Sequence, residues 1–127
     1  MFSHVMVGSN DMARSRAFYD ALFAATGGGP GREDAAGRLI YSHRGGRLMI
    51  TKPIDGGTAT GANGGTIGFT MESADEAQAW HAAGVANGGS AVEDPPGERR
   101  SPAGRMYLAY LRDPDGNKLC ALHRMAA

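Results

Sequence analysis

The sequence predicts an α+β protein built from two similar modules. Residues 2–28 and 65–89 can be laid over each other so that His4 falls on Thr66. Each of these segments has the pattern of a strand, a capped helix and a glycine stop, and each half of the chain continues into a hairpin signature. The repetition of this unit predicts two copies that share one core.

The first copy begins with a short strand, in which Val5 and Val7 alternate with Ser3, and His4 is an inserted polar residue. Asp11 is placed to cap a helix that runs to about Ala25. Residues 26–30 (TGGGP) should end it, because glycine adopts the left-handed conformation at no steric cost and proline cannot continue the helix. The apolar residues that recur near helical spacing are Met12, Phe18, Tyr19, Leu22 and Phe23.

The second copy has the stronger helix signal. Ser73 and Glu76 fit a capping box, in which the serine oxygen accepts an amide and the glutamate reaches back to the serine amide. This helix should end at residues 87–89 (NGG). The residues that it is expected to turn toward the core are Ala77, Trp80 and Val85.

Both copies are followed by strand pairs. Strands over 38–43 and 47–52 flank an RGG turn, and strands over 106–112 and 118–122 flank a DPDGN turn whose proline and glycine favour a reversal. A third strand in each half has no clear signal. Residues 53–64, rich in Gly and Thr, are interpreted as the linker between module 1 (about 1–52) and module 2 (about 65–127).

Composition restricts the function. The 127 residues fit one domain, and 13 Lys and Arg balance 13 Asp and Glu, which argues against a nucleic-acid or membrane-surface partner. The single Cys120 excludes an intrachain disulfide, and there is no signal-peptide pattern or 18-residue apolar run. We therefore expect a cytoplasmic protein. The glycine run at 27–29 follows a helix, whereas a dinucleotide fingerprint would open one.

Three motifs carry a family resemblance. HVMVG at 4–8, the ND cap with SRAFYDAL at 15–22, and RDPDGNKL at 112–119 resemble the vicinal oxygen chelate superfamily. That superfamily includes lactoylglutathione lyases, bleomycin-resistance proteins, fosfomycin-modifying enzymes and extradiol dioxygenases. The resemblance implies two βαβββ modules that form curved mixed sheets around a shared cavity, frequently in a homodimer.

The resemblance also implies where a metal would bind. Metal-dependent relatives take ligands from the first and last strands of each module, and the matching positions here are His4, Met49, Thr66 and Cys120. Only His4 is of the expected type. A hard cation such as Mg²⁺ or Mn²⁺ prefers several oxygen ligands, which methionine and cysteine do not provide.

A softer ion could use the imidazole of His4 and the thiolate of Cys120. The nearby candidates for a third ligand are His43 and His123. The turn after His43 breaks its register with Met49, and His123, three residues after Cys120, should point to the opposite face. We therefore expect no cofactor, with a divalent metal such as zinc, nickel, iron or manganese as the alternative.

Several residues have both a functional and a structural interpretation. Cys120 is a thiolate nucleophile or a small buried apolar residue, and nothing in the sequence lowers its pKa. Tyr107 and Tyr110 are three apart on a strand and should face opposite sides, so one of them can offer its hydroxyl to the cavity. The methionines that could line an adaptable apolar cavity, or fill the core, are Met6, Met49 and Met71.

Residues 93–105 (EDPPGERRSPAGR) are interpreted as a long loop. It is a solvated connector or, at a cavity mouth, a site where Arg99 and Arg100 bind an anionic ligand, because the arginine side chain suits carboxylate and phosphate groups.

Three function classes remain at this point. The sequence fits best a metal-independent protein that binds a small molecule. The expected ligand contacts are His4, Met49, Thr66, Arg99, Arg100, Tyr107 and Cys120. The second class is a divalent-metal-dependent lyase, isomerase or dioxygenase, in which a cation stabilises adjacent substrate oxygens. The third is a silent subunit whose dimer surface is its role. No general acid or base is placed by spacing.

Overall fold

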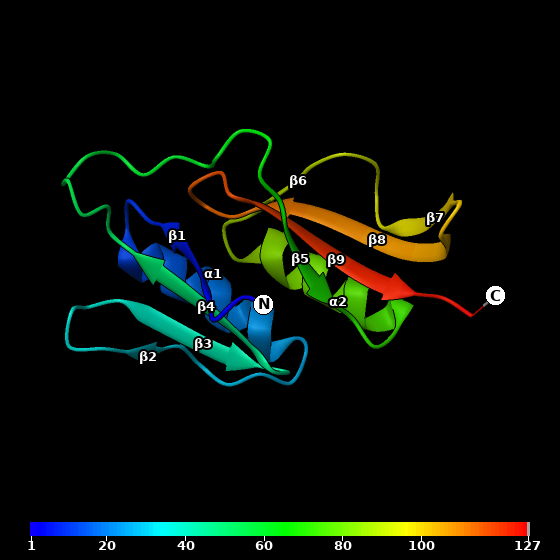
Figure 1. The fold of residues 1–127 in the computed structure, drawn as a ribbon, viewed down its shortest axis with the longest axis horizontal. Helices are drawn as coiled ribbons and strands as arrows, with labels where there is room; N and C mark the ends of the chain where they lie inside the picture. Colours follow the sequence, from blue (N-terminus) through cyan, green and yellow to red (C-terminus); the bar gives the residue numbers. More distant parts are fainter. Residues whose placement is uncertain (127) are drawn as a thin grey trace.

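Two modules lie side by side, each made of a sheet with one helix packed against it (Figure 1). The computed structural model describes residues 1–126. The first module contains β1 (Val5–Gly8), α1 (Met12–Ala24), β2 (Arg32–Glu33), β3 (Leu39–His43) and β4 (Gly46–Thr51). The second contains β5 (Ile67–Thr70), α2 (Ala74–Ala86), β6 (Ser90–Ala91), β7 (Gly97–Ser101), β8 (Gly104–Arg112) and β9 (Lys118–Arg124). The α+β class and the repeated strand–helix order are confirmed.

Both sheets are mixed and open. The first has the order β1-β4-β3-β2 and the second the order β5-β9-β8-β6, with β7 paired to β8. In each module the first and last strands are parallel neighbours, and the remaining pairs are antiparallel. The corresponding registers, Met6 opposite Met49 and Gly68 opposite Cys120, show the repeat that the sequence predicts.

The segment expected to be a loop at 93–105 is partly a strand. β7 forms a hairpin with β8, in which Arg99 lies opposite Met106 and Arg100 opposite Arg105. The expectation of a loop was wrong because Pro95 and Pro96 precede the paired residues and so do not interrupt the strand. The weak third strands are β2 and β6, of two residues each.

The helix ends follow the predicted caps, with one difference. Asp11 accepts the amide of Arg14, and Ser73 accepts the amide of Glu76, both at 3.0 Å. The Glu76 carboxylate, however, accepts the amide of Glu72 at 3.1 Å and not that of Ser73. The side chain is also held by Arg44 at 2.5 and 2.7 Å, and this ion pair directs it away from the expected box geometry.

The core lies between the two helices and the sheet faces that they cover. Phe18, Tyr19 and Leu22 of α1 are buried, as are Ala77 and Trp80 of α2. The expectation that Val85 faces the core is wrong, since its side chain is 47 % exposed. Gly84 takes that position, and a Cβ there would lie 2.3 Å from the Leu111 Cδ1, so this site requires the smallest residue.

The DPDGN turn joins the two modules through a buried polar network. Asp113 is 4 % exposed and accepts hydrogen bonds from the Tyr19 hydroxyl at 2.5 Å and the Asn117 side chain at 2.8 Å. It also accepts the backbone amides of Asp115 and Asn117, both at 2.9 Å. Asp115 in turn accepts the amide of Asn10 and a hydrogen bond from Ser15. A turn of the second module is thereby fixed to the first helix.

Arg44 joins the modules at the other end. It lies in the β3–β4 turn with a positive φ of 49°, followed by Gly45 at 81°, as the tight hairpin turn requires. Its guanidinium donates to Glu76 of α2 and to the carbonyl of Thr26, which follows α1.

Among the described residues, neither helix is long enough to cross a membrane, since α1 and α2 have 13 residues each.

Candidate functional site

A cavity of about 350 Å³ lies between the first sheet and β5. Residues 2–4, which precede β1, also line it. β1, β3 and β4 form one wall, and β5 with Trp80 of α2 forms the other. This volume is at the lower end of the ~300–1,000 Å³ typical of small-molecule sites. We call it the inter-module cavity.

The interior of the inter-module cavity is aromatic. Phe23 and Tyr41 stack with ring centroids 4.8 Å apart, and Phe69 meets Phe23 edge-on at 6.0 Å and Trp80 at 6.1 Å. The Tyr41 hydroxyl is directed away to Asp20, to which it donates at 2.6 Å. The wall of the cavity therefore presents ring faces and ring edges, and flat apolar groups pack well against such a surface.

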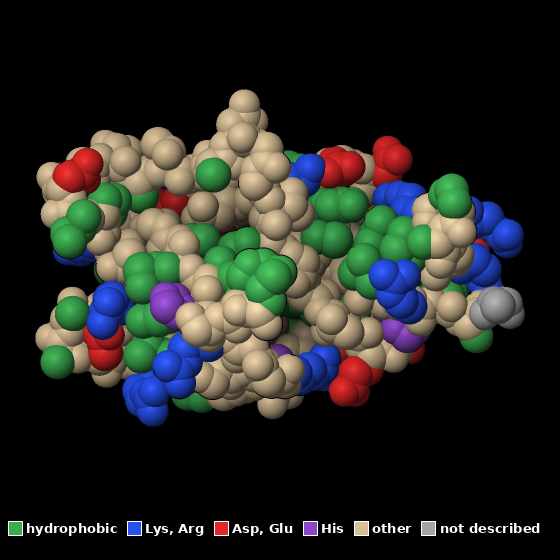
Figure 2. All heavy atoms as spheres, viewed as in Figure 1, with side chains coloured by type: hydrophobic (Ala, Val, Ile, Leu, Met, Phe, Trp, Pro, Cys, Tyr) green, Lys and Arg blue, Asp and Glu red, His purple; other side chains and the backbone are tan. Residues whose placement is uncertain are grey.

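The mouth of the cavity is polar and basic. A shallow hollow adjoins it and shares Ser3, His43, Arg44, Gly46 and Arg47 with the cavity lining. We call this second space the basic hollow, and its lining also includes Ser42 and Gly45. On the face that Figure 2 shows, basic, histidine and acidic side chains lie beside exposed hydrophobic ones. Among the described residues that line the cavity or the basic hollow, none is Asp or Glu.

Three of the basic side chains at the mouth have protein partners. The His43 Nε2 lies 3.1 Å from the Thr26 hydroxyl, and the His4 Nδ1 lies 2.8 Å from the Ser3 hydroxyl. Arg44 is held by Glu76, which keeps the pKa of the guanidinium above its ordinary value and that of the Glu76 carboxyl below it. In the described part of the chain, Arg47 makes no ion pair.

The four positions implied by the metal-dependent relatives lie at different places. His4 borders the inter-module cavity, whereas Met49, Thr66 and Cys120 do not line it. Leu48 and Ile50 belong to the helix-covered core, so Met49 between them faces the other side of the first sheet. By the same alternation Cys120, between Leu119 and Ala121, faces the uncovered side of the second sheet.

These positions do not fit a metal ion. Within residues 1–126 no three His, Cys, Asp or Glu side chains are grouped so that they could hold one. The two candidates for a third ligand are both engaged elsewhere: His43 contacts Thr26, and the His123 Nδ1 lies 3.1 Å from the carbonyl oxygen of Met71. Donor chemistry and position thus both argue against the set implied by the resemblance.

Cys120 has the environment of an inert thiol. It is 6 % exposed, and burial raises its pKa above the ordinary value, an effect that the hydrogen bond with Tyr110 opposes only in part. Lys118 lies 5.0 Å from the centre of the Tyr110 ring and is paired with Glu93. The Lys118 charge lowers the pKa of Cys120 and the Glu93 charge raises it, so the net shift remains upward.

We therefore expect Cys120 to react slowly with iodoacetamide. At pH 7.5 the folded protein should be alkylated at least about tenfold more slowly than free cysteine, because little thiolate is present and access is restricted. Mass spectrometry of timed samples measures the rate, and the same protein in urea should react like free cysteine. Folded protein that reacts faster than free cysteine would show an activated thiol.

The two tyrosines of β8 face opposite sides, as their spacing predicts. The Tyr107 hydroxyl accepts a hydrogen bond from Gln78 of α2 at 2.7 Å, so it lies on the helix-covered face. Tyr110 lies opposite Cys120 on the uncovered face. Tyr107 and Cys120 are consequently not brought to one surface.

Arg99 and Arg100 do not line the inter-module cavity. Arg99 donates to the carbonyl of Pro95 at 2.9 Å, and Arg100 lies 3.6 Å from Glu98 with its side chain 78 % exposed. The arginines at the cavity mouth are Arg44 and Arg47, and Arg47 makes no ion pair among the described residues. Arg47 was not identified as a site residue from the sequence. Its position could have indicated this role, because Arg47 directly precedes Leu48 and lies at the same end of the β1–β4 pair as His4.

A two-module α+β fold, with parallel first and last strands in each module and a cavity between the modules, defines the structural class. The family model of the glyoxalase/bleomycin resistance protein/dioxygenase superfamily matches residues 1–121. The chain belongs to this superfamily.

Solved structures agree with this assignment. A glyoxalase/bleomycin resistance protein from Albidiferax ferrireducens T118 is 55 % identical, with a TM-score of 0.93 over 98 % of this chain and 99 % of that one. A lactoylglutathione lyase from Agrobacterium tumefaciens is 19 % identical, with a TM-score of 0.66 over 97 % of this chain and 92 % of that one, and shows the fold alone. A glyoxalase/bleomycin resistance protein/dioxygenase family enzyme from Burkholderia phytofirmans PsJN is 15 % identical, with a TM-score of 0.72 over 97 % and 98 %. No curated protein matches the sequence.

Proposed function

We propose that this protein binds a small apolar molecule in the inter-module cavity and does so without a metal ion. The observation that carries the proposal is the cavity itself, about 350 Å³, with the aromatic rings of Phe23, Tyr41, Phe69 and Trp80 in its interior wall and Phe2 also in its lining. Burial of a ring against such a wall gains about 25 cal/mol for each Å² of apolar surface removed from water. Binding of this kind requires no cation.

The uneven distribution of polar groups supports the proposal. Donors and acceptors gather at the mouth, around Ser3, His43 and Arg44, while the interior between Phe23 and Trp80 is apolar. A ligand site of this type takes its affinity from the apolar part and its orientation from a few polar groups.

The first test is metal content. Protein purified without chelators should contain well under one equivalent of zinc, nickel, iron or manganese by elemental analysis, and calorimetric titration with each ion should show no stoichiometric binding. This follows from the donor set, in which His4 has no suitable partner at Met49, Thr66 or Cys120. A stoichiometric ion that is lost in the His4→Ala variant would favour the alternative, a metal-dependent lyase, isomerase or dioxygenase.

The second test is a substitution that reduces the volume of the cavity. Val5 lines it, whereas Val7 lies on the same strand and the same sheet face outside the lining. Val5→Phe should weaken binding of the neutral dye N-phenyl-1-naphthylamine about tenfold or more, since the added ring occupies ligand space. Dye fluorescence measures the affinity, with circular dichroism as the check of folding.

Val7→Phe is the matched control, and its dye affinity should stay within about twofold of the unmodified protein. Equal losses in the two variants, or no dye binding by the unmodified protein, would reject the inter-module cavity as the binding site.

A further inference from the structure

We propose that the inter-module cavity binds an aromatic carboxylate, with the ring inside the cavity and the carboxylate on Arg47. The inference rests on the proposed function and adds the chemical class of the ligand. It is carried by the arrangement, among residues 1–126, of one arginine without an ion pair, two hydroxyls and an aromatic wall around a continuous space.

Arg47 is the cation available at the mouth. Arg44, the other arginine of the basic hollow, has both guanidinium nitrogens on the Glu76 carboxylate at 2.5 and 2.7 Å. Within the described part of the chain, Arg47 has neither an ion pair nor a side-chain hydrogen bond. Its planar guanidinium can therefore donate two parallel hydrogen bonds to a carboxylate of the ligand.

The neighbours of Arg47 suit an anion. Ser42 lies directly opposite Arg47 in the β3–β4 register, and by strand alternation both side chains lie on the face opposite Tyr41 and Leu48. With Ser3 they line the basic hollow beside the opening of the cavity, so two hydroxyl donors border the space next to Arg47. No described residue that lines the cavity or the hollow is Asp or Glu, and the two nearby carboxylates, Glu72 and Glu76, are both paired with Arg44. The charges select an anionic head group over a cationic one.

The shape of the cavity and the basic hollow determines which ring system the carboxylate can carry. The cavity and the basic hollow share their lining at His43, Arg44 and Arg47, so one molecule can extend from one into the other. A cavity of about 350 Å³ holds one or two fused rings. The ligand class is therefore a monocarboxylic acid on a small aromatic ring system.

The test compares an acid with its neutral amide. Calorimetry should give the unmodified protein about tenfold higher affinity for 2-naphthoate than for 2-naphthamide, the scale of one charge-assisted contact at a partly exposed site. Arg47→Gln should remove this preference, mainly by weakening the binding of 2-naphthoate. The preference should also shrink as salt is raised from 0.05 to about 0.5 M.

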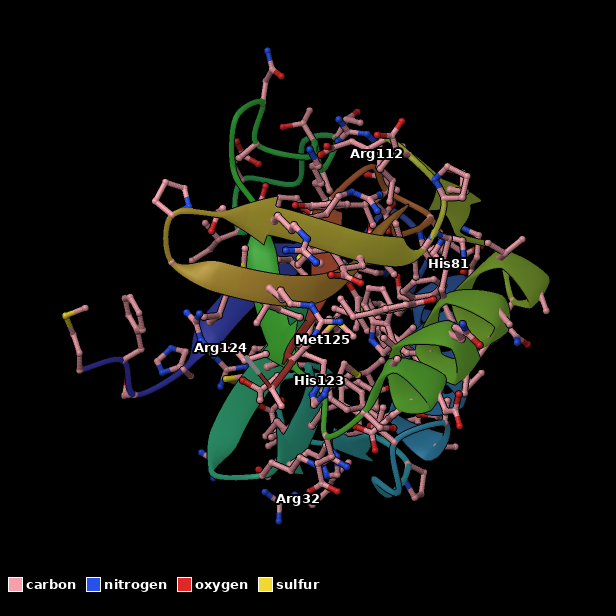
Figure 3. All side chains as sticks on the ribbon, turned by 90° about the vertical axis from the view of Figure 1, so that its right-hand side faces the viewer. Arg32, His81, Arg112, His123, Arg124 and Met125 are labelled. Carbon is pink, nitrogen blue, oxygen red and sulfur yellow. The ribbon has the colours of Figure 1, made fainter. Side chains whose placement is uncertain are left out.

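Arg32→Gln is the matched control. Arg32 lies on β2 at the outer edge of the same sheet, lines neither space and projects away from the molecule (Figure 3). This variant loses the same charge and should keep the full preference for the acid.

The outcomes separate the two proposals. Equal binding of acid and amide by the unmodified protein, or equal effects of the two arginine substitutions, would overturn the role of Arg47 and leave cavity binding intact. If neither naphthalene compound binds and the neutral dye also fails, both proposals are rejected.

Discussion

Replacing Asp113 with alanine is expected to lower the free energy of unfolding by about 4 kcal/mol, the largest single-residue effect that we anticipate. The carboxylate is 4 % exposed and accepts four hydrogen bonds, from the Tyr19 hydroxyl, the Asn117 side chain and two backbone amides. Its removal leaves these donors buried without an acceptor. Each such donor costs about 1–3 kcal/mol, and partial entry of water reduces the sum.

Urea denaturation followed by circular dichroism measures this effect. Tyr19→Phe removes one donor and leaves Asp113 with three, so its loss should be smaller, about 1.5 kcal/mol. Asp55→Ala is the matched control, because Asp55 is an exposed turn aspartate whose side chain accepts only the amide of Gly57. Its effect should stay within about 0.5 kcal/mol.

An Asp113→Ala variant as stable as Asp55→Ala would show that the network is not required for folding. The same network accounts for two of the motifs that carry the family resemblance. The RDPDGNKL and SRAFYDAL motifs meet at the contact between Asp113 and Tyr19, which holds the second module against the first helix. Two of the three motifs by which the superfamily is recognised therefore report how the modules are joined, and these two do not define the chemistry of the site.

Local signals in the sequence were sufficient for most of the fold. The caps at Asp11 and Ser73 and the hairpin turns depend on neighbouring residues, and the structure confirms them. The errors involve contacts distant in sequence. Glu76 leaves the expected capping box because Arg44, 32 residues earlier, holds its carboxylate. The strand at 97–101 depends on pairing with β8 and not on its own composition.

The site was less predictable than the fold. Alternation along single strands correctly separated Tyr107 from Tyr110 and His123 from Cys120. It could not show that the cavity opens between two modules, because the distance between β4 and β5 is set by helix packing and by the Arg44 and Asp113 contacts. For the same reason Arg47 was missed, although it is next to Leu48 on a strand that the sequence does predict.

Alkaline pH should unfold the protein in a way that depends on two buried tyrosines. Burial, and next the charge of Asp113, hold the pKa of Tyr19 well above its ordinary value. Burial, and next the hydrogen bond to Asp20, raise the pKa of Tyr41. Above pH 10 both side chains ionise in the unfolded chain and stay protonated in the folded protein, so the unfolded state binds fewer protons.

The sign follows from this difference. A folded-state pKa above the unfolded value gives a contribution that is complete below pH 10 and is lost as the pH rises, at about 1.4 kcal/mol per pH unit for each tyrosine. Urea midpoints at pH 8, 10, 11 and 11.5 measure the loss. Tyr19→Phe should lower the slope above pH 10 by about one proton, whereas changes common to all variants, such as lysine titration, cancel in the comparison. Equal slopes for the unmodified protein and Tyr19→Phe would mean that Tyr19 ionises in the folded state, and its contact with Asp113 could then not persist as a hydroxyl donor to a buried carboxylate.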